Sequence, residues 1–495
     1  MERKSGVLMH ISSLPSDHGI GTLGKEAYNF VDFLHEAHQT YWQILPLSQT
    51  GFGDSPYQSV STFAGNPYFI DLDMLCDDGL LAKEDYLDID WKANTDSINY
   101  GVMFKKRYPV LRKAVSNLFK TKALDDYYDF CHHNSWVEDY ALFMAIKTRH
   151  GNVGLSSWDR KFRLKDKETI DCFCNDEENR KEIDFWKGVQ YLFFCQWFSL
   201  KEYANSRGIS IIGDCPIYVA EDSCDLWSHP DLFQVDKDLK LIRVAGCPPD
   251  GFSPRGQLWG NPLYKWEEHK KDNYSWWVSR ISHLCMVYDY VRIDHFRGLA
   301  SYYSIDADAE DALDGKWVKG PSKDLIRSIR ENVGENIIAE DLGYMDDEVK
   351  DLLNYSKFPG MNVMEFGFDS RDADSNDNIP YNFRKNSVVY CGTHDNETIM
   401  GWIHSIPEDQ LEYCKEYMNA EKDSDMNWAM IRCLFESNAD TAIVQAQDLL
   451  GLDNSARMNK PSTLGNNWKW RAEKGVFNKK IADKLKKMSH TYGRA

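Results

Sequence analysis

Eight short apolar runs, each typical of a buried β-strand, recur along the chain and are separated mostly by helical patterns. Eight parallel strands with helices between them close into a (β/α)8 barrel. We therefore predict an α/β fold of the TIM-barrel type. The runs that we interpret as barrel strands are Val7–Ile11, Tyr41–Leu47, Ile209–Asp214, Met286–Tyr290, Asn336–Leu342, Met361–Phe366, Val388–Asp395 and Thr441–Asp448.

The spacing of these runs predicts where the barrel is enlarged. The chain has 495 residues, enough for two or three average domains or for one barrel with insertions. We predict a single catalytic barrel over 1–495, with a mostly helical insertion at 48–184 after the second strand. A second insertion, 220–280, follows the third strand.

The second insertion carries a loop, 246–262, that is rich in proline, glycine and aromatic residues. Its prolines and glycines exclude a helix or a central strand. Its tryptophan and phenylalanine are too apolar for an idle surface loop. We predict a lid over a substrate site, and the alternative is an aromatic loop that packs on the barrel.

Composition narrows the class of ligand. The formal net charge is -19 and no basic run occurs, which argues against nucleic acid and anionic membranes as partners. A neutral or cationic ligand fits better. Aromatic residues make up 13% of the chain, which is typical of a protein with flat platforms for sugar rings, although a large aromatic core would give the same figure.

The first residues and the cysteines predict a cytoplasmic protein without a metal. The start of the chain lacks the long apolar segment of a signal peptide, and no run has transmembrane length. The twelve cysteines are scattered without a Cys-x2-Cys pair, which favours reduced thiols. Two small groups, Cys172–Cys174 and Cys131–His133, lack a partner group at ligand spacing, so we predict no metal site.

Three of the predicted strands end at an acidic residue, where a barrel of this kind carries its catalytic groups. Asp294 follows the fourth strand, Glu340 ends the fifth and Asp395 ends the seventh. Alternation along the fourth strand places Arg292 on the same side as Asp294. A guanidinium keeps a neighbouring acid ionised, as a nucleophile requires, although an isolated pair of this kind is more often a structural ion pair.

Carboxylates that converge at one barrel mouth repel one another, so at least one pKa should rise. That arrangement supplies a proton donor beside an ionised nucleophile and suits the cleavage of a glycosidic bond. We predict that Asp294 attacks the anomeric carbon, while Glu340 protonates the leaving oxygen and later deprotonates the acceptor. Asp395 and His394 would hold ring hydroxyls. Each acid alone is more typical of a cap or an ion pair, but the three together favour catalysis.

These motifs carry a resemblance to a known family. Arg292–Gly298, Ala339–Gly343 and Thr393–Asn396 resemble the three catalytic motifs of the 4-α-glucanotransferases, or amylomaltases, of glycoside hydrolase family 77. The resemblance extends over essentially the whole chain. Further similar segments are Asp54–Gln58, Trp136–Phe143, Ile212–Val219, Pro248–Pro262, Ala456–Asn459 and Asn467–Trp468.

The resemblance implies a retaining double displacement in an α-amylase-like barrel without a separate C-terminal β-domain. Asp294 would be the nucleophile, Glu340 the acid/base and Asp395 the transition-state stabiliser. It implies no cofactor, and the sequence shows no cluster of oxygen ligands that demands calcium. The partners would be α-1,4-glucans, maltooligosaccharides and glucose. The residues that it implies in substrate binding are Ser55, Tyr57, Asp214, Asp250, Trp259, Arg292, His394 and Asn467.

Four positions depart from the family pattern. Ser462 and Asn466 stand where the family usually has glycines, and Cys247 and Gly251 differ within the lid loop. None of them touches the three acids, and they bear on the shape of the acceptor side and hence on the preferred chain length. We favour a transglycosylase because an aromatic lid would exclude water. An α-glucan hydrolase of the α-amylase type is the alternative. A non-catalytic glucan-binding barrel is a third reading, but its mark would be a lost acid or arginine, and all are present.

Overall fold

The structure, a computed structural model, describes residues 3–51, 53–91, 96–121, 124–249, 253–343, 345–369 and 375–495. Eight parallel strands form the central sheet, in the order β10-β11-β12-β1-β2-β3-β6-β9. The backbone N–H of Ala339 on β9 donates to the carbonyl of Pro359 beside β10 at 2.9 Å, which brings the two ends of the sheet together. The strands are β1 (Lys4–Leu8), β2 (Tyr41–Gln43), β3 (Ser210–Cys215), β6 (Tyr290–Ile293), β9 (Ile337–Ala339), β10 (Gly360–Val363), β11 (Ser387–Tyr390) and β12 (Thr441–Gln445).

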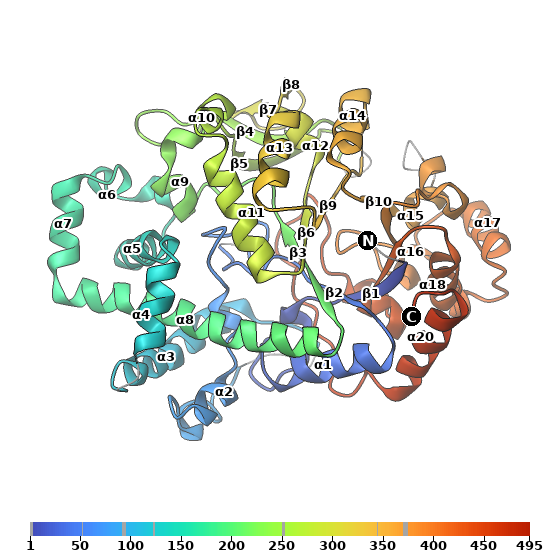
Figure 1. The fold of residues 1–495 in the computed structure, drawn as a ribbon, viewed down its shortest axis with the longest axis horizontal. Coiled ribbons are helices and arrows are strands. Elements are labelled where there is room, and N and C mark those ends of the chain that lie inside the picture. The colour runs from blue at the N-terminus through green and yellow to red at the C-terminus, as the bar shows by residue number, and fades with distance from the viewer. Residues whose placement is uncertain are drawn as a thin grey trace.

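This ring confirms the predicted (β/α)8 barrel, and each predicted run contributes one strand or leads into one (Figure 1). Several boundaries were wrong. Most strands end before the predicted end of their run, for example at Gln43, Val363, Tyr390 and Gln445, and in two of these runs the last residues begin a helix instead, at Met364 and at Ala446. Met286 and Val287, predicted to begin the fourth strand, instead end a helix, and the strand begins at Tyr290. Helix and strand meet there in one continuous apolar stretch, and an apolar stretch does not distinguish a buried strand from a buried helix end.

Most helices pack around the outside of this ring. Trp42, Val291 and Ile293 are fully buried among the strands and helices that make up the core. The helices that lie between or after barrel strands are α1 (Lys25–Glu36), α11 (Ser275–Val287), α12 (Arg297–Ala300), α13 (Ser322–Asn332), α14 (Asp347–Ser356), α15 (Met364–Phe368), α16 (Ile399–Trp402), α17 (Glu408–Met418), α18 (Met426–Glu436), α19 (Ala446–Leu450) and α20 (Lys479–Thr491). Residues 446–495 thus contain α19 and α20 and add no strand to either sheet.

A group of helices lies to one side of the barrel between β2 and β3, at the left of Figure 1. They are α2 (Leu72–Asp77), α3 (Tyr100–Leu118), α4 (Asp125–His133), α5 (Trp136–Arg149), α6 (Arg160–Arg163), α7 (Lys167–Asn175) and α8 (Glu177–Ser206). Helix α8 has 30 residues and ends against the barrel. Trp197 on α8 is fully buried, and its indole N–H donates to the carbonyl of Val287 at 3.0 Å.

A second, antiparallel sheet lies at the edge of the barrel, at the top of Figure 1. Its order is β5-β4-β7-β8, and its strands are β4 (Arg243–Cys247), β5 (Gln257–Pro262), β7 (Ser301–Asp306) and β8 (Lys316–Lys319). Two short helices, α9 (Cys224–Ser228) and α10 (Trp266–Lys271), flank it in the sequence. Strand β5 belongs to the loop predicted as a lid, and it occupies a sheet edge, where Pro262 costs no ladder hydrogen bond.

Gly213 allows a close approach that positions the end of β3. A Cβ atom at this glycine would lie 2.2 Å from ring carbons of Tyr288, a buried side chain whose hydroxyl accepts the backbone N–H of Leu47. We expect Gly213→Ala to displace the ring and to lower the free energy of unfolding by about 1–3 kcal/mol. The urea midpoint measures this. An unchanged midpoint would mean that the ring can move without cost.

Candidate active site

Asp294 and Glu340 lie side by side because their strands pair in register. Ile293 and Ala339 are paired residues of β6 and β9, and each acid directly follows one of them. The backbone N–H of Glu340 donates to the carbonyl of Ile293, and that of Asp294 donates to the carbonyl of Cys215, both at 3.0 Å. Two adjacent strands therefore present these two acids at the carboxyl-terminal edge of the barrel, as the sequence predicts.

Arg292 joins two acids from neighbouring strands. Its guanidinium lies 2.6 Å from Asp214 and 3.0 Å from Asp294, and the arginine is only 3% exposed. Tyr57 donates its hydroxyl proton to the same Asp214 oxygen at 2.7 Å. Four of the predicted site residues thus form one connected group. A buried arginine with two acid partners fixes the direction of the Asp294 carboxyl group.

Glu340 is held by the backbone. The N–H of His295 donates to one of its carboxyl oxygens at 2.6 Å, and the N–H of Leu342 donates to the other at 3.0 Å. His295 adopts φ +49, an uncommon conformation for a residue other than glycine. Left-handed backbone of this kind concentrates at functional sites, and here it aims an N–H at Glu340.

The acids influence one another as their convergence predicts. Burial raises the pKa of Glu340, and the Arg292 guanidinium and the two backbone N–H groups offset only part of that rise. Burial also raises the pKa of Asp294; Arg292 lowers it, and the carboxylates of Asp214, Glu340 and Asp395 raise it further. Arg292 is therefore the group that favours ionisation of Asp294, since its other charged neighbours all oppose it.

Asp395 comes from the loop after β11 and has the most exposed side chain of the three acids, at 41%, compared with 28% for Asp294. The amide of Asn459 donates to its carboxylate at 2.6 Å, and Arg457 donates to its backbone carbonyl at 2.6 Å. We assigned no role to Asn459 or Arg457 from the sequence. In the sequence they stand out only as part of a short segment that resembles the family. They lie 64 and 62 residues from Asp395 along the chain, so no local pattern links them to it.

An aromatic wall flanks the acids. The rings of Tyr57 and His394 are stacked, with centroids 5.2 Å apart and planes 11° from parallel. The indole of Trp468 lies 5.7 Å from Tyr57 and 6.0 Å from His394. Burial lowers the pKa of His394. His394 and Trp468 are 3% and 5% exposed, and Tyr57 is partly buried, so the wall is an apolar surface with a neutral imidazole, which suits an uncharged ring with hydroxyl groups.

Trp259 reaches the site from the antiparallel sheet. It lies on β5, and its indole meets the ring of His295 edge-to-face at 4.9 Å. His295 is the residue whose N–H holds Glu340. The predicted lid loop thus contacts the acid through one intervening residue.

The other predicted contacts have different environments. The Ser55 hydroxyl accepts the N–H of Tyr57 at 3.2 Å and so shapes the turn before that tyrosine. The Asn467 amide is bonded within its own loop, to Lys460 and Thr463. Asp250 lies outside the described residues. Substrate contacts by these three residues stay predictions.

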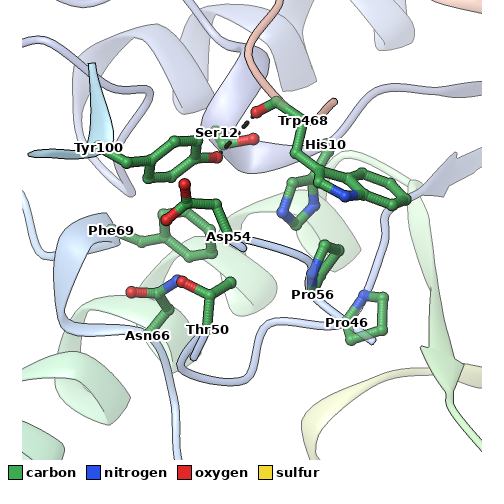
Figure 2. Close-up of a pocket in the computed structure, with 10 residues that line it drawn as sticks. All are labelled: His10, Ser12, Pro46, Thr50, Asp54, Pro56, Asn66, Phe69, Tyr100 and Trp468. Atoms are coloured by element: carbon green, nitrogen blue, oxygen red, sulfur yellow. Dashed lines mark hydrogen bonds between the residues drawn. The ribbon is translucent and has the colours of Figure 1, made fainter. Parts of the chain in front are cut away.

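A small cavity is lined on one side by Asp54 and Pro56, just before Tyr57 in the chain (Figure 2). Tyr100 also lines it and donates its hydroxyl proton to the carbonyl of Trp468 at 2.8 Å. Asp54 points into the same space with φ +62, and burial raises its pKa to about 6. The residues that line the cavity are His10, Ser12, Pro46, Thr50, Asp54, Pro56, Asn66, Phe69, Tyr100 and Trp468. Within the described ranges, no group of three or more His, Cys, Asp or Glu residues is placed to hold a metal ion.

Comparison with known proteins gives the site its context. A family model described as 4-alpha-glucanotransferase matches residues 9–476. The chain belongs to the 4-alpha-glucanotransferase family. A relative of that name from Clostridium butyricum is 47% identical over 490 residues, which cover 98% of this chain and 100% of that protein. A relative of the same name from Aquifex aeolicus is 41% identical and is covered to 99%.

A solved structure agrees with the sequence relatives. The amylomaltase from Streptococcus agalactiae in complex with acarbose is similar over 100% of both chains, with a TM-score of 0.97 and 44% identity. The family and fold predicted from the motifs are therefore confirmed. No helix within the described part of the chain is both long and apolar enough to cross a membrane.

Proposed function

We propose that this protein transfers a segment of a 1,4-α-D-glucan to the 4-hydroxyl of an acceptor glucan or of glucose. The observation that carries the proposal is the pairing of Arg292 with Asp294 beside the backbone-held Glu340. Membership of the 4-alpha-glucanotransferase family supports the reaction class. The acarbose complex of the Streptococcus agalactiae amylomaltase supports an oligosaccharide ligand for this chain as well.

The first step forms a covalent glycosyl-enzyme. A carboxylate oxygen of Asp294 attacks the anomeric carbon, and the bond from that carbon to the glycosidic oxygen breaks. Glu340 gives its proton to the departing oxygen, so that the leaving glucan ends in a free 4-hydroxyl. Asp395 and His394 hold hydroxyls of the distorted ring. Asn459 supports this role because it fixes the direction of the Asp395 carboxylate.

The second step reverses the first with a new alcohol. Glu340, now a carboxylate, takes the proton of the acceptor 4-hydroxyl as its oxygen attacks the anomeric carbon. The bond to Asp294 breaks, and two inversions leave the α configuration retained. Tyr57 and Trp259 are proposed to stack on sugars, and Asp214 and Arg292 to line the subsite of the reacting glucose. Ser55, Asp250 and Asn467 are proposed as further polar contacts.

The choice of acceptor is proposed to depend on the 246–262 segment, acting as a lid. Trp259 supports this role because it contacts His295 next to Glu340. A sugar seated under this segment would exclude water from the intermediate. We also propose that the chain is a single catalytic barrel with insertions at 48–184 and 220–280. An α-glucan hydrolase is the outcome expected if water enters instead.

We further propose a cytoplasmic role in maltooligosaccharide and glycogen or starch metabolism. None of the twelve cysteines, all of which the structure describes, is in a disulfide, which supports a reducing compartment. Labelled glucose tests the proposed transfer. After incubation with maltotriose and ¹³C-glucose, label in maltose and longer oligomers supports it. Label found in glucose alone would contradict transfer and favour an α-glucan hydrolase.

Both limbs of the pH profile of kcat/KM should lie at higher pH than ordinary carboxyl groups would give. Asp294 must lose its proton to attack, and Glu340 must keep its proton to act as the acid. Because both pKa values lie above the ordinary 3.8 and 4.5, kcat/KM rises through a pH above 3.8 and falls through a pH above 4.5. A pH series with maltotriose measures both limbs. An alkaline limb at or below 4.5 would contradict the assignment of Glu340.

Asn459→Ala tests the support of Asp395. The variant removes the donor that lies 2.6 Å from the Asp395 carboxylate. Hydrogen bonds to charged groups contribute about 1.5–3 kcal/mol, so we expect kcat to fall by about 10- to 100-fold. Initial rates with maltotriose measure the effect. Asn29→Ala is a matched control on an exposed residue of α1, away from the acids. Equal rates in the two variants would argue against this role.

A further inference from the structure

A buried carboxyl group lies directly beneath the loop that carries His394 and Asp395. Glu365 is the second residue of α15, which directly follows β10, and it is 2% exposed. Its backbone N–H donates to the carbonyl of Cys391, the residue after β11. Within the described residues, its Oε1 atom has no hydrogen-bond partner. Burying a carboxyl oxygen without a hydrogen-bond partner costs free energy, so a role for this group is worth seeking.

Glu365 connects to Asp395 through one asparagine. The Glu365 and Asn396 side chains meet at Gly392, where an added Cβ atom would lie 2.7 Å from Oε1 of Glu365 and 3.0 Å from Cβ of Asn396, and hydrogen bonding by Asn396 lowers the pKa of Glu365 against the larger rise caused by burial. The Asn396 Oδ1 atom accepts the N–H of Thr393 at 3.0 Å and the hydroxyl of Thr393 at 2.8 Å. The Thr393 hydroxyl in turn accepts the N–H of Asp395 at 3.4 Å. The Glu365 carboxyl group is therefore linked to the backbone of Asp395 through Asn396 and Thr393.

The Glu365 carboxyl group packs closely against the start of the turn. A Cβ atom on Gly392 would lie 2.7 Å from its Oε1 atom, so the first residue of the turn packs directly on the carboxyl group. The charged groups that face it are Asp448, Glu397 and Arg457. Two of these three are acids, and burial with these acids raises the pKa of Glu365 well above its ordinary value. A neutral side chain of the shape of glutamate or glutamine therefore fits the space.

Arg457 links this cluster to the active site from the other side. It donates to the carbonyl of Asp395 at 2.6 Å and lies 4.0 Å from Glu397. A negative charge on Glu365 would attract the guanidinium away from Asp395. With Glu365 neutral, Arg457 and Asn459 keep their hydrogen bonds to Asp395. Asn396 keeps its hydrogen bonds to Thr393 in the turn.

We infer that Glu365 is a positioning residue for Asp395 and His394, acting through Asn396 and Thr393 on the turn that carries both. The inference rests on the proposed function, because it assigns Glu365 to the reaction that those residues serve. Glu365 does not touch the sugar in this account. Its role is to hold the Asp395 carboxylate in the direction that stabilises the positive charge of the transition state.

The test compares two substitutions of similar size. Glu365→Gln stays neutral and can still accept from Asn396, whereas Glu365→Met fills the space without that acceptor. Small misplacements of a catalytic group cost up to about 100-fold. We therefore expect Glu365→Met to lower kcat by about 10- to 100-fold with KM within about twofold, and Glu365→Gln to keep kcat within about threefold.

Thermal unfolding of both variants separates this role from a structural one. Loss of thermal stability in Glu365→Met with an unchanged kcat per folded molecule would overturn the inference. So would a kcat for Glu365→Gln as low as that for Glu365→Met. Should Glu365→Met fail to fold, Asn396→Ala removes the other side of the same bond and should lower kcat to the same extent.

The double variant Glu365→Met with Asn396→Ala completes the test. If both residues act on the same turn, the double variant should be no slower than the slower single variant. Multiplied losses would overturn the inference. Total bond cleavage and transfer products are measured separately. If the wild-type enzyme only hydrolyses, the proposed function is contradicted. The effect of the Glu365 variants on the rate of bond cleavage would still test the inference about Glu365.

Discussion

Asp294→Asn is expected to lower kcat for maltotriose by at least about 10⁴-fold, because losing a covalent nucleophile removes the whole two-step route. The amide has the shape of the carboxyl group but carries no charge and does not attack the anomeric carbon. Arg292 would keep its salt bridge to Asp214 at 2.6 Å. The fold should survive, because the Asp294 side chain is 28% exposed and lies at the end of a strand.

The control for Asp294→Asn is binding. Isothermal titration with acarbose or maltotetraose should give a dissociation constant within about tenfold of the wild-type value, since the other polar contacts remain. Initial rates must be corrected for any wild-type contamination. A variant that keeps more than about one hundredth of the wild-type kcat would contradict the assignment of Asp294 as the nucleophile.

Glu340→Gln is expected to lower kcat for maltotriose by about 10³-fold, the range of general acid–base catalysis. The glutamine keeps the shape of the side chain but can accept only one of the two backbone N–H groups, because His295 and Leu342 bond different carboxyl oxygens, at 2.6 and 3.0 Å, and an amide nitrogen does not accept. The first step should recover with α-maltosyl fluoride, because fluoride leaves without a proton. The second step should remain slow, because no base takes the acceptor proton.

This imbalance offers a direct view of the intermediate. Glu340→Gln treated with α-maltosyl fluoride should accumulate a maltosyl adduct on a peptide that contains Asp294, detectable by mass spectrometry after digestion. The double variant with Asp294→Asn is the control and should give no adduct. An adduct on another residue, or rates with the fluoride as low as with maltotriose, would contradict the division of roles between the two acids.

The barrel could be predicted from the sequence because each strand is a short apolar run between helical patterns. The acids at 294, 340 and 395 could be predicted in the same way, because they lie where those runs end. The start of β6 was misplaced because α11 ends in Met286 and Val287, which are as apolar as the strand that follows. Strands β7 and β8 were not predicted. Strand β8 is exposed at all four positions and so has no alternating pattern.

The partners of the acids were harder to predict than the acids. Asn459 and Arg457 hold Asp395 from more than 60 residues away, and nothing in local periodicity links them. Glu365 lies in an apolar run that predicted only a strand, and its proximity to Asn396 depends on the neighbouring positions of β10 and β11. Such contacts arise from the register of the closed sheet, which single-strand patterns do not encode.

The most direct test of the central claim is a product ladder from pure maltotriose, with total reducing ends followed in the same reaction. Transfer conserves the number of reducing ends, because each cleaved bond is replaced by a new one. We predict glucose together with maltopentaose and longer oligomers at constant reducing ends. Reducing ends that rise while only shorter products form would contradict this account and would make water the acceptor of the Asp294 intermediate.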